Sequence, residues 1–453
     1  MPTTFRPYDP DQMLLMPPAL RDWLSEGHLA HHVSDLVDGL DLGVFYAPYE
    51  GDGRRKSPYE PRMMLKVLIY GYARGVFSSR GIARKLEEDV AFTSLRSVGL
   101  HLRVLAAGNF PSHRTICEFR RRHLDDFKRL FVEVVRLAAE LGAVRFGTLS
   151  IDGTKVRANA SKRKAMSYKR MVSEERRLKA EIDRLVGRAG KVDAAEDERL
   201  GADVRGDEMP AGLKRRKDRV KAIREAILEA KARLEAAQRE QDDARGRKPG
   251  MDRNPKGGRP YKRAYGVPED KAQSNFTDPE SGIMKTSSEG FQQCYNAQLA
   301  VDDERQLIVA AEVTANASDQ GQLLPRLDEV EAAYGAVPER VLADAGYCNE
   351  RDLLALEERG VDGYVALGRE GKKAAADAKS RPAAARMLKK LLKPEGHAQY
   401  ARRKWLSEAP NGWIKQAMGF RRFSVRGLRK VQGEWALVCL ALNMKRMQGL
   451  QAA

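Results

Sequence analysis

The chain has 453 residues, with 81 lysines and arginines against 63 aspartates and glutamates and a net charge of +18. This length exceeds one ordinary hydrophobic core, so two or three domains are expected, and the positive charge predicts attraction to a polyanion such as nucleic acid or an anionic membrane. No apolar run approaches the roughly 18 residues that span a bilayer, and the first residues lack the basic-then-apolar order of a signal peptide, so we expect a cytoplasmic protein.

The first part of the chain, to about residue 145, favours helices. Apolar residues recur at helical spacing from Met64 to Tyr72 and again from Phe127 to Val134. Between these runs a serine can cap a helix with the sequence HRTICEFRRRH. Such a basic helix is typical of a DNA-reading unit, with Arg120 and Arg121 as candidate DNA contacts. The alternative is a plain helical bundle with a solvated basic face.

The spacing changes at residues 148–156, TLSIDGTKV, where apolar and polar residues alternate as in a β-strand. Asp152 would then lie on the opposite face of the strand from Ile151.

Residues 157–265 are densely charged and poor in apolar side chains, which indicates an insertion. Two narrow apolar stripes, one at Leu178, Ile182 and Leu185 and one from Val220 to Ala237, predict an antiparallel pair of helices. The following stretch, 245–263, is basic and rich in glycine and proline. It indicates either a flexible phosphate-binding tether or a solvated linker.

Strand and helix patterns alternate in the rest of the chain. Predicted strands are YNAQLAVD at 295–302, LIVAAEVT at 307–314, RVLADAG at 340–346 and GYVALG at 363–368. Helical spacing follows the second and third of these strands, and the tail is helical through 435–444. The order predicts an α/β fold with a mixed sheet, interrupted after its first strand by the charged insertion.

Two aspartates stand where a core would otherwise hold apolar residues. Asp152 precedes Gly153, where the backbone can pass close to a ligand. Asp344 ends an apolar run and opens into a loop, a usual place for ligand-binding groups in such sheets. Phosphodiester cleavage needs charge neutralised on the transferred group, which divalent cations held by carboxylates supply. Asp152 and Asp344 are therefore candidate metal ligands, with a turn-forming role as the alternative for each.

Three motifs, in this order, resemble those of the DDE transposases of bacterial insertion sequences, in the branch with a Tyr-Arg-Glu-Lys signature. The first two catalytic strands of that family resemble SIDGTKV and VLADAGY. The signature falls on Tyr400, Arg403, Glu408 and Lys415 in YARRKWLSEAPNGWIK, followed by GFRRFSVRG. The family's N-terminal domain resembles FRPYDPDQ and PYEPRMMLKVLIYGYARGVFSSRGIARKL, so the resemblance extends over nearly the whole chain.

The resemblance implies the role of each site residue. Asp152, Asp344 and Glu408 would be the catalytic carboxylates and would bind Mg²⁺ or Mn²⁺, with two ions per site. Four residues separate Arg403 from Glu408 where the signature has three, so Lys404 could take the role of the arginine. The implied DNA-binding residues near the site are Tyr400, Arg403, Lys404, Lys415, Arg421 and Arg422.

The segment around Glu408 has two structural interpretations. Ser407 can cap a helix that begins at Glu408, with Pro410 in its first turn, where a missing N–H breaks no bond. The alternative is one helix from about Tyr400 that is kinked at Pro410. Asn411 stands where members of the family often have an aromatic residue.

Aromatic rings beside the expected site could stack on an unpaired base. The candidates are Trp405, Trp413 and Tyr347, and core packing is the alternative role for at least one tryptophan.

The resemblance also implies the domain organisation and the reaction. A helical DNA-end-binding domain at 1–145 would precede a ribonuclease-H-like catalytic domain made of 146–158 and 268–448, with 159–267 as a helical-hairpin insertion and basic linker. Metal-dependent strand cleavage would be followed by attack of the freed 3′-hydroxyl on target DNA. The partners would be double-stranded DNA, as terminal inverted repeats and target, and a second protomer in a paired-end complex.

Two other functions fit the same residues. A metal nuclease or resolvase would use this fold without joining the product, and a DNA-binding regulator would have an idle catalytic pocket. The acidic residues that rival the proposed ligands are Asp302, Asp319 and Glu434, which match no motif of the family.

Overall fold

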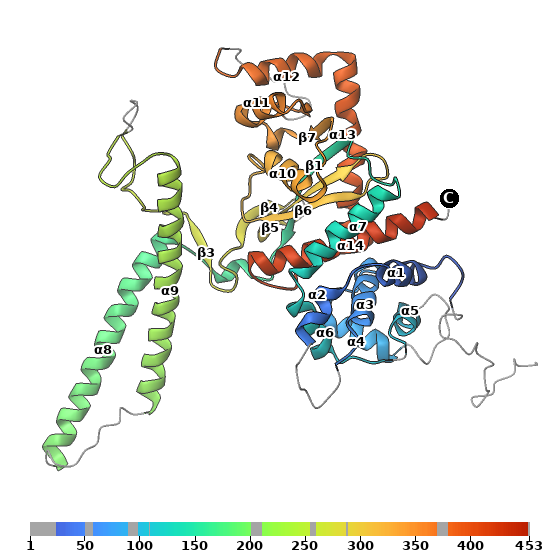
Figure 1. Cartoon of the computed structure of the whole chain (residues 1–453). Helices are drawn as coiled ribbons and strands as arrows, with labels where there is room; N and C mark the ends of the chain where they lie inside the picture. The colour runs from blue at the N-terminus through green and yellow to red at the C-terminus, as the bar shows by residue number, and fades with distance from the viewer. Residues whose placement is uncertain are drawn as a thin grey trace, which may run out of the picture.

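The computed structural model describes residues 24–49, 58–88, 98–107, 109–200, 211–253, 260–286, 289–368 and 379–451. Figure 1 shows a helical N-terminal region, a central sheet with helices around it, and a long two-helix arm that projects from the sheet. The FRPYDPDQ motif and part of the predicted basic tether, 254–259, lie outside the described residues.

Helices form the N-terminal region, as predicted. Ser112 caps α6, because its hydroxyl accepts a hydrogen bond from the Thr115 amide at 3.3 Å. The following helix, α7, packs against the C-terminal helix α14 and strand β6, and so connects this region to the sheet. The N-terminal helices are α1 (Leu29–Asp38), α2 (Gly43–Tyr46), α3 (Pro61–Ala73), α4 (Ser79–Glu88), α5 (Val98–Leu105), α6 (His113–Arg122) and α7 (Asp126–Glu140). The C-terminal helix α14 spans Leu428–Gln451.

The central sheet is mixed. Strand β5 runs antiparallel to β1, whereas β7 and β8 follow on the other side of β1 as parallel strands. The outer neighbours of β5 are β4, along its first part, and β6, along its second. This arrangement confirms the predicted ribonuclease-H-like α/β fold. The strands are β1 (Thr148–Arg157), β4 (Gly282–Thr286), β5 (Gly290–Asp302), β6 (Ile308–Thr314), β7 (Arg340–Ala343) and β8 (Asp362–Val365).

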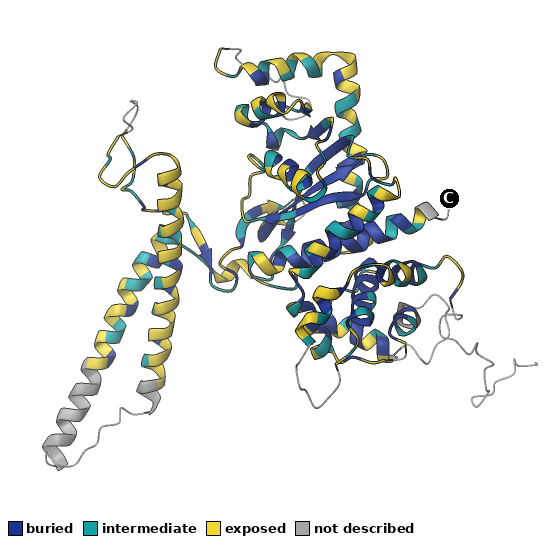
Figure 2. Ribbon diagram, viewed as in Figure 1, coloured by how far each residue is buried: buried dark blue, intermediate teal, exposed yellow. Residues whose placement is uncertain are grey.

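The strands predicted at 295–302, 307–314, 340–346 and 363–368 correspond to β5, β6, β7 and β8. Strand β4 was not predicted, because the short segment GIMKT lacks a clear alternation of apolar and polar residues. Helices α10 (Leu323–Tyr334) and α11 (Glu350–Glu358) follow β6 and β7 as expected. Figure 2 shows that the sheet and α14 contain much of the buried core.

The two faces of the sheet are covered by different helices. On one face, Ser150 of β1 shares a hydrogen bond of 2.6 Å with Ser407 of α13 (Pro394–Gly412). Ile151, which points to the other face, belongs to the same buried apolar cluster as Trp435 of α14. The first of these faces also carries Asp152, two residues beyond Ser150.

The predicted helical pair is confirmed as α8 (Tyr168–Leu200) and α9 (Ala211–Ala244), which form the arm. The arm has its own small apolar cluster, in which Leu178 of α8 packs with Ile227 of α9. Ile223 lies outside that contact and is 44% exposed, in contrast to the predicted stripe. At the base of the arm, β2 (Ala165–Ser167) and β3 (Gln273–Asn275) form a two-stranded antiparallel ribbon.

Helix α13 corrects one prediction. It continues from Pro394 through Ser407 to Gly412, so a new helix capped by Ser407 does not begin at Glu408. The Ser407 hydroxyl instead donates to the Arg403 carbonyl at 3.1 Å, one turn earlier. Pro410 lies inside the helix and lacks an N–H group, and a π-helical turn, Trp413–Ala417, follows. The alternative prediction of one continuous helix is therefore closer to the structure, although the observed helix begins six residues before Tyr400.

None of the helices in the described part of the chain is both long enough and apolar enough to cross a membrane.

Candidate catalytic site

Two of the predicted catalytic carboxylates lie at neighbouring positions of the sheet. Ile151 of β1 is level with Ala343 of the parallel strand β7, so the next residues, Asp152 and Asp344, come side by side. Asp344 follows the last residue of β7, and its carboxylate accepts a hydrogen bond from the Gly346 amide at 2.8 Å. The expected position of Asp344 at a strand end is thus observed.

The environment of Asp152 favours its neutral form. Burial raises the pKa of Asp152 to about 6; the nearby Arg403 guanidinium lowers that pKa, and the carboxylates of Asp344 and Asp319 raise it. Several acidic groups therefore repel one another at this end of the sheet. Such repulsion is relieved by a bound cation, which is the usual reason why carboxylates gather in a protein interior.

Helix α13 supplies the side chains that face these aspartates. Arg403, Ser407 and Asn411 are four residues apart in turn and so share one face of the helix. Asn411 donates from Nδ2 to Oδ2 of Asp152 at 3.2 Å, and Arg403 lies close enough to both aspartates to interact with their charges. The pKa of Arg403 is raised, because Tyr400, Asp152 and Asp344 outweigh the effect of burial. Asn411, a departure from the family pattern, is therefore a direct partner of Asp152.

Glu408 is at the same end of the sheet but is more open to solvent. Its side chain is 61% exposed, and its carboxylate lies 3.9 Å from the Arg403 guanidinium. In the described ranges, no three His, Cys, Asp or Glu side chains converge as metal ligands do. The role of Glu408 as the third ligand thus stays a prediction.

Asp319, which matched no motif, also belongs to this site. One of its oxygens, Oδ1, accepts hydrogen bonds from Asn296 at 2.7 Å, Gln298 at 2.8 Å and Lys155 at 3.2 Å. A Cβ atom at Gly153 would stand 2.4 Å from the same oxygen, so a larger residue there would displace the Asp319 side chain. Like Asp344, Asp319 follows a strand in the loop before the next helix, and this position is the signal that could have found it.

Asp319 also approaches Asp344. A Cβ atom placed on Gly346 would lie 3.0 Å from Oδ1 of Asp344 and 3.4 Å from Oδ2 of Asp319. A side chain at Gly346 would therefore crowd both carboxylates.

The other two rival acids have structural roles. Asp302 accepts hydrogen bonds from the amides of Phe146 at 2.8 Å and Glu304 at 3.0 Å. Glu434 is fully buried and accepts hydrogen bonds from the Tyr72 hydroxyl at 3.1 Å and from the Ser424 amide at 2.7 Å.

The residues at the site fit a divalent cation and a phosphate. Asp152 and Asp344 offer carboxylate oxygens, the ligands that Mg²⁺ prefers. Three polar atoms around them are buried without a hydrogen-bond partner among the described residues: Oδ1 of Asn411, Oδ1 of Asn296 and Nε of Arg403. Unpaired buried polar atoms are costly, so these atoms are suited to a bound ligand. Oxygen atoms suit a cation, and an arginine N–H suits a phosphate oxygen.

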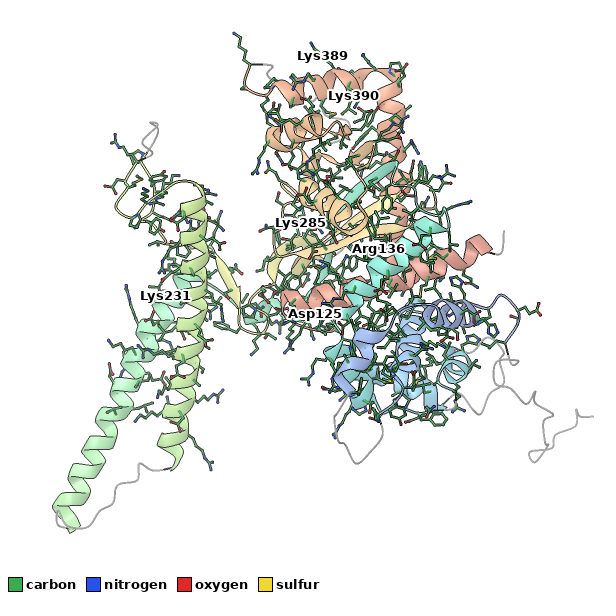
Figure 3. All side chains as sticks on the ribbon, viewed as in Figure 1. Asp125, Arg136, Lys231, Lys285, Lys389 and Lys390 are labelled. Carbon is green, nitrogen blue, oxygen red and sulfur yellow. The ribbon has the colours of Figure 1, made fainter. Side chains whose placement is uncertain are left out.

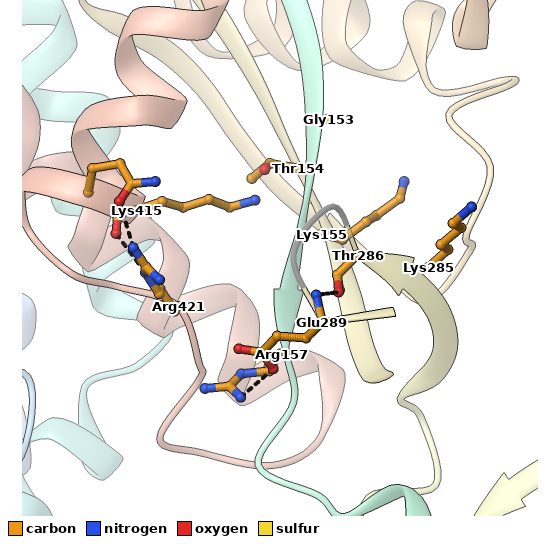
Figure 4. A pocket seen from close by; sticks show the side chains of 10 residues that line it. Gly153, Thr154, Lys155, Arg157, Lys285, Thr286, Glu289, Lys415 and Arg421 are labelled. Carbon is orange, nitrogen blue, oxygen red and sulfur yellow. Dashed lines mark hydrogen bonds and ion pairs between the residues drawn. The ribbon is translucent and has the colours of Figure 1, made fainter. Parts of the chain in front are cut away.

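A basic pocket of about 310 Å³ opens beside the aspartates (Figure 4). Lys415 lines it, and burial lowers the pKa of Lys415 although Asp152 lies near enough to oppose this. Arg421 lines the same pocket, and Arg422 lines an adjoining one of about 210 Å³. The backbone fixes both arginines beside β1, because the Arg157 amide donates to the Arg421 carbonyl at 3.2 Å. These three of the predicted DNA-binding residues therefore lie together.

The other predicted DNA contacts near α13 are placed differently. Tyr400 is half-buried against the apolar cluster of Leu342, Tyr364 and Leu406, and the Arg403 guanidinium lies 5.8 Å from the centre of its ring. Lys404 is exposed. Direct contact of either residue with DNA stays a prediction.

The structure contradicts the predicted DNA contact of Arg120. Its side chain is buried and donates hydrogen bonds to the Tyr72 hydroxyl at 3.0 Å and the Phe77 carbonyl at 2.8 Å. Arg121 is exposed and pairs with Glu118 at 2.6 Å, so its contact with DNA stays a prediction.

Base stacking by Tyr347 is also contradicted. The ring is 1% exposed, and its hydroxyl donates to Gln298 inside the core. Trp405 and Trp413 are 47% and 43% exposed, and the amino group of Lys445 lies 4.8 Å from the centre of the Trp413 ring. Stacking on these two rings stays a prediction.

The fold and the site together define a class of enzyme. The sheet is ribonuclease-H-like, it carries aspartates at neighbouring strand positions, and a basic pocket lies beside them. These features are typical of enzymes that act on the phosphodiester bonds of nucleic acids.

Comparison with known families identifies the family within that class. Residues 266–444 match the model described as "Transposase DDE domain", and residues 18–122 match "Transposase domain (DUF772)". No curated protein and no solved structure matches the chain. The chain belongs to the insertion-sequence DDE transposases, which cleave DNA and transfer strands and generally use a divalent metal. Asp152 lies outside both matched ranges, so its assignment depends on its place beside Asp344.

Proposed function

We propose that this transposase cleaves DNA at the ends of an insertion sequence and joins the freed 3′-hydroxyl to target DNA, with Asp152, Asp344 and Glu408 as metal ligands. The observation that supports this most is the adjacency of Asp152 and Asp344 beneath Arg403 and Asn411. Two Mg²⁺ or Mn²⁺ ions held there would supply positive charge to the phosphoryl oxygens and to the attacking and leaving groups.

Protein side chains have separate tasks in this proposal. Arg403 and Lys415 bind and orient the scissile phosphate from opposite ends of the Glu408 segment, since one faces the aspartates and the other lines the basic pocket. Asn411 holds the Asp152 carboxylate in place through its hydrogen bond of 3.2 Å. Glu408 would be the third residue to hold the metal, because its exposed side chain is free to leave Arg403 for the aspartates.

We also propose the partners of this reaction. The N-terminal helices would bind the terminal inverted repeats, and two protomers would bring two ends together in a dimer. The substrate would be chromosomal or plasmid DNA in the bacterial cytoplasm.

The decisive experiment uses Asp344→Asn. The wild-type protein is expected to nick a plasmid that contains the element end in Mg²⁺, and to join a pre-cleaved end with a free 3′-hydroxyl to a second plasmid. Asp344→Asn should lose both activities by at least about a thousandfold while it still binds the end, because a neutral amide is a poor ligand for the cation. Nicking without joining would favour a nuclease or resolvase instead.

One observation favours a second candidate, a DNA-binding regulator without catalysis. Glu408 contacts Arg403, and three acidic ligands do not converge in the described part of the chain. If wild type and Asp344→Asn bind DNA equally and neither nicks it in Mg²⁺ or Mn²⁺, the regulator is the correct function.

A further inference from the structure

The pocket beside the aspartates has more positive charge than the predicted signature residues provide. Lys155 and Arg157 enter it from β1, and Lys285 enters it from β4, in addition to Lys415 and Arg421. Glu289 is the single acidic residue among those that line it. Figure 4 shows Lys415 and Arg421 on one side of β1 and Lys285 on the other.

The charges of the pocket are partly compensated. Arg157 pairs with Glu289 at 2.7 Å, and Lys155 pairs with Asp319 at 3.2 Å. No acidic partner for Lys285 is found in the described ranges. An excess of positive charge in a confined space is costly without an anion, so the pocket is suited to a polyanionic ligand.

The pocket continues along β1, away from the carboxylates. A second pocket shares Arg157 with the first and adds Arg422. We call the two together the basic groove, lined by Lys155, Arg157, Lys285, Lys415, Arg421 and Arg422. At the usual rise of a strand, Lys155 is about 10 Å and Arg157 about 17 Å along β1 from Asp152. These distances span on the order of three to five nucleotides of one DNA strand at about 3.4 Å each.

We propose that the basic groove binds the backbone phosphates of the DNA that adjoins the scissile phosphate on one side, with the β4–β5 hairpin as one wall of the groove. This inference rests on the proposed cleavage at the aspartates, and it assigns Lys285, Arg157 and Lys155 as phosphate contacts. The hairpin is held in shape close to Lys285, because the Thr286 hydroxyl donates to the Gly290 carbonyl at 2.9 Å. The groove is polar and basic, so it recognises backbone and not base sequence.

The first test measures binding in the full-length Asp344→Asn protein, which separates it from catalysis. The probe is a fluorescent 30-base-pair duplex of arbitrary sequence, and its dissociation constant is followed as salt is raised. Lys285→Ala should lower the slope of log K against log salt by about 1, because one phosphate contact is lost. Lys389→Ala is the matched control, because Lys389 is an exposed lysine on α12 (Pro382–Leu392), far from Lys285 (Figure 3). The slope of log K against log salt for this variant should equal that of the parent Asp344→Asn protein.

A second test locates the DNA and does not depend on affinity. Lys285→Cys is labelled with a photo-crosslinker in the Asp344→Asn, Cys117→Ser background, which removes the exposed native thiol. On an element-end duplex with ten base pairs of flanking DNA, crosslinks are expected within about five nucleotides of the cleavage point and on one side of it. The same label at Lys389→Cys should give none there.

The outcomes separate the groove from the proposed function. Equal salt slopes for Lys285→Ala and Lys389→Ala, or crosslinks from Lys285→Cys spread over both sides of the cleavage point, would overturn the groove even if the wild type nicks DNA normally. Adjacent crosslinks in a protein that never nicks would support the groove and refute the proposed catalysis.

Discussion

Asp152 is the residue at which the electrostatics of the site can be measured most directly. Its pKa is raised to about 6 by burial and by the neighbouring aspartates, against an ordinary value of 3.8. A carboxyl group with a raised pKa favours the folded state at low pH, and this contribution is lost as the pH rises through about 6. Without metal, the ionised carboxylate therefore costs the fold up to about 3 kcal/mol above that pH.

We expect Mg²⁺ to raise the unfolding temperature of the wild type at pH 7.5 and to lose this effect as the pH falls through about 6, because protons then displace the cation from Asp152. Asp152→Asn should be more stable than the wild type in metal-free buffer at pH 7.5, should lose this advantage near pH 4, and should not respond to Mg²⁺. Thermal melts at several pH values with and without Mg²⁺ measure all three effects.

Asp302→Asn is the matched control for this experiment. Burial also raises the pKa of Asp302 to about 6, but this residue binds backbone amides away from the site. Its substitution should change the melting temperature and leave the Mg²⁺ response intact. A Mg²⁺ response that is constant from pH 5 to pH 8 would show that Asp152 is not a ligand.

Some residues of the site could be predicted from the sequence and others could not. Asp344 and Asp152 could be found because each breaks an apolar strand, which is visible along the chain. Asp319 also follows a strand, which is a signal in the sequence, but its proximity to Gly153 and Gly346 depends on loops that are remote in sequence. The hydrogen bond between Asn411 and Asp152 had no sequence signal for the same reason.

At the scale of elements, the helical arm and the main strands followed from periodicity, since burial repeats every two residues in a strand and about every 3.6 in a helix. The boundaries of α13 did not follow. Pro410 and Ser407 are typical of a helix start, but packing of Ser407 on Ser150 keeps the helix continuous through both residues. Tertiary contacts thus outweighed the local signal, and the π-helical turn that sets the position of Lys415 could not be predicted.

Helix α14 makes a close backbone contact that can be tested. A Cβ atom at Gly433 would stand 2.2 Å from the Leu124 carbonyl oxygen, between α6 and α7. Gly433→Ala should therefore lower the free energy of unfolding by about 3 kcal/mol, because two backbones must move apart. Urea unfolding measures this loss.

The control lies on the same helix. No atom would come within 4 Å of a Cβ at Gly449, so Gly449→Ala should raise stability by up to about 1 kcal/mol through helix propensity. If both alanine variants unfold at the same urea concentration, the close contact at Gly433 does not exist in solution.

At the scale of the whole molecule, a buried polar network joins the N-terminal helices to the catalytic domain. Arg120 of α6 lies 3.8 Å from Glu434 of α14, and both contact the Tyr72 hydroxyl of α3. Burial of Tyr72 and the adjacent Glu434 raise the pKa of its hydroxyl far above the ordinary value, so it stays protonated and can donate. DNA bound by the N-terminal helices would therefore be held in a fixed position relative to α14.

We expect Arg120→Met to reduce stability by about 3–5 kcal/mol, because Glu434 is left as a buried charge without its partner. The salt dependence of DNA binding by the folded variant should equal that of the wild type, since Arg120 does not reach the surface. Urea unfolding and DNA titrations in the same buffer measure the two effects.

Arg121→Ala provides the comparison. Arg121 is the neighbour of Arg120 in the sequence, but its side chain is exposed and pairs with Glu118. Its stability should change by less than about 0.5 kcal/mol. A lower salt slope for Arg121→Ala would support the predicted role of α6 in DNA binding. A lower slope for Arg120→Met would instead contradict its buried position.

The arm leaves the catalytic domain and returns to it at one place, where Ala165 of β2 is level with Asn275 of β3. The two ends of this insertion of about a hundred residues are thus adjacent and form a neck. Shortening the insertion would not require any strand of the main sheet to change its position. A tight turn from Ser167 to Gln273 would complete an ordinary hairpin. We therefore expect that an arm of another length could be placed on this neck without altering the catalytic centre.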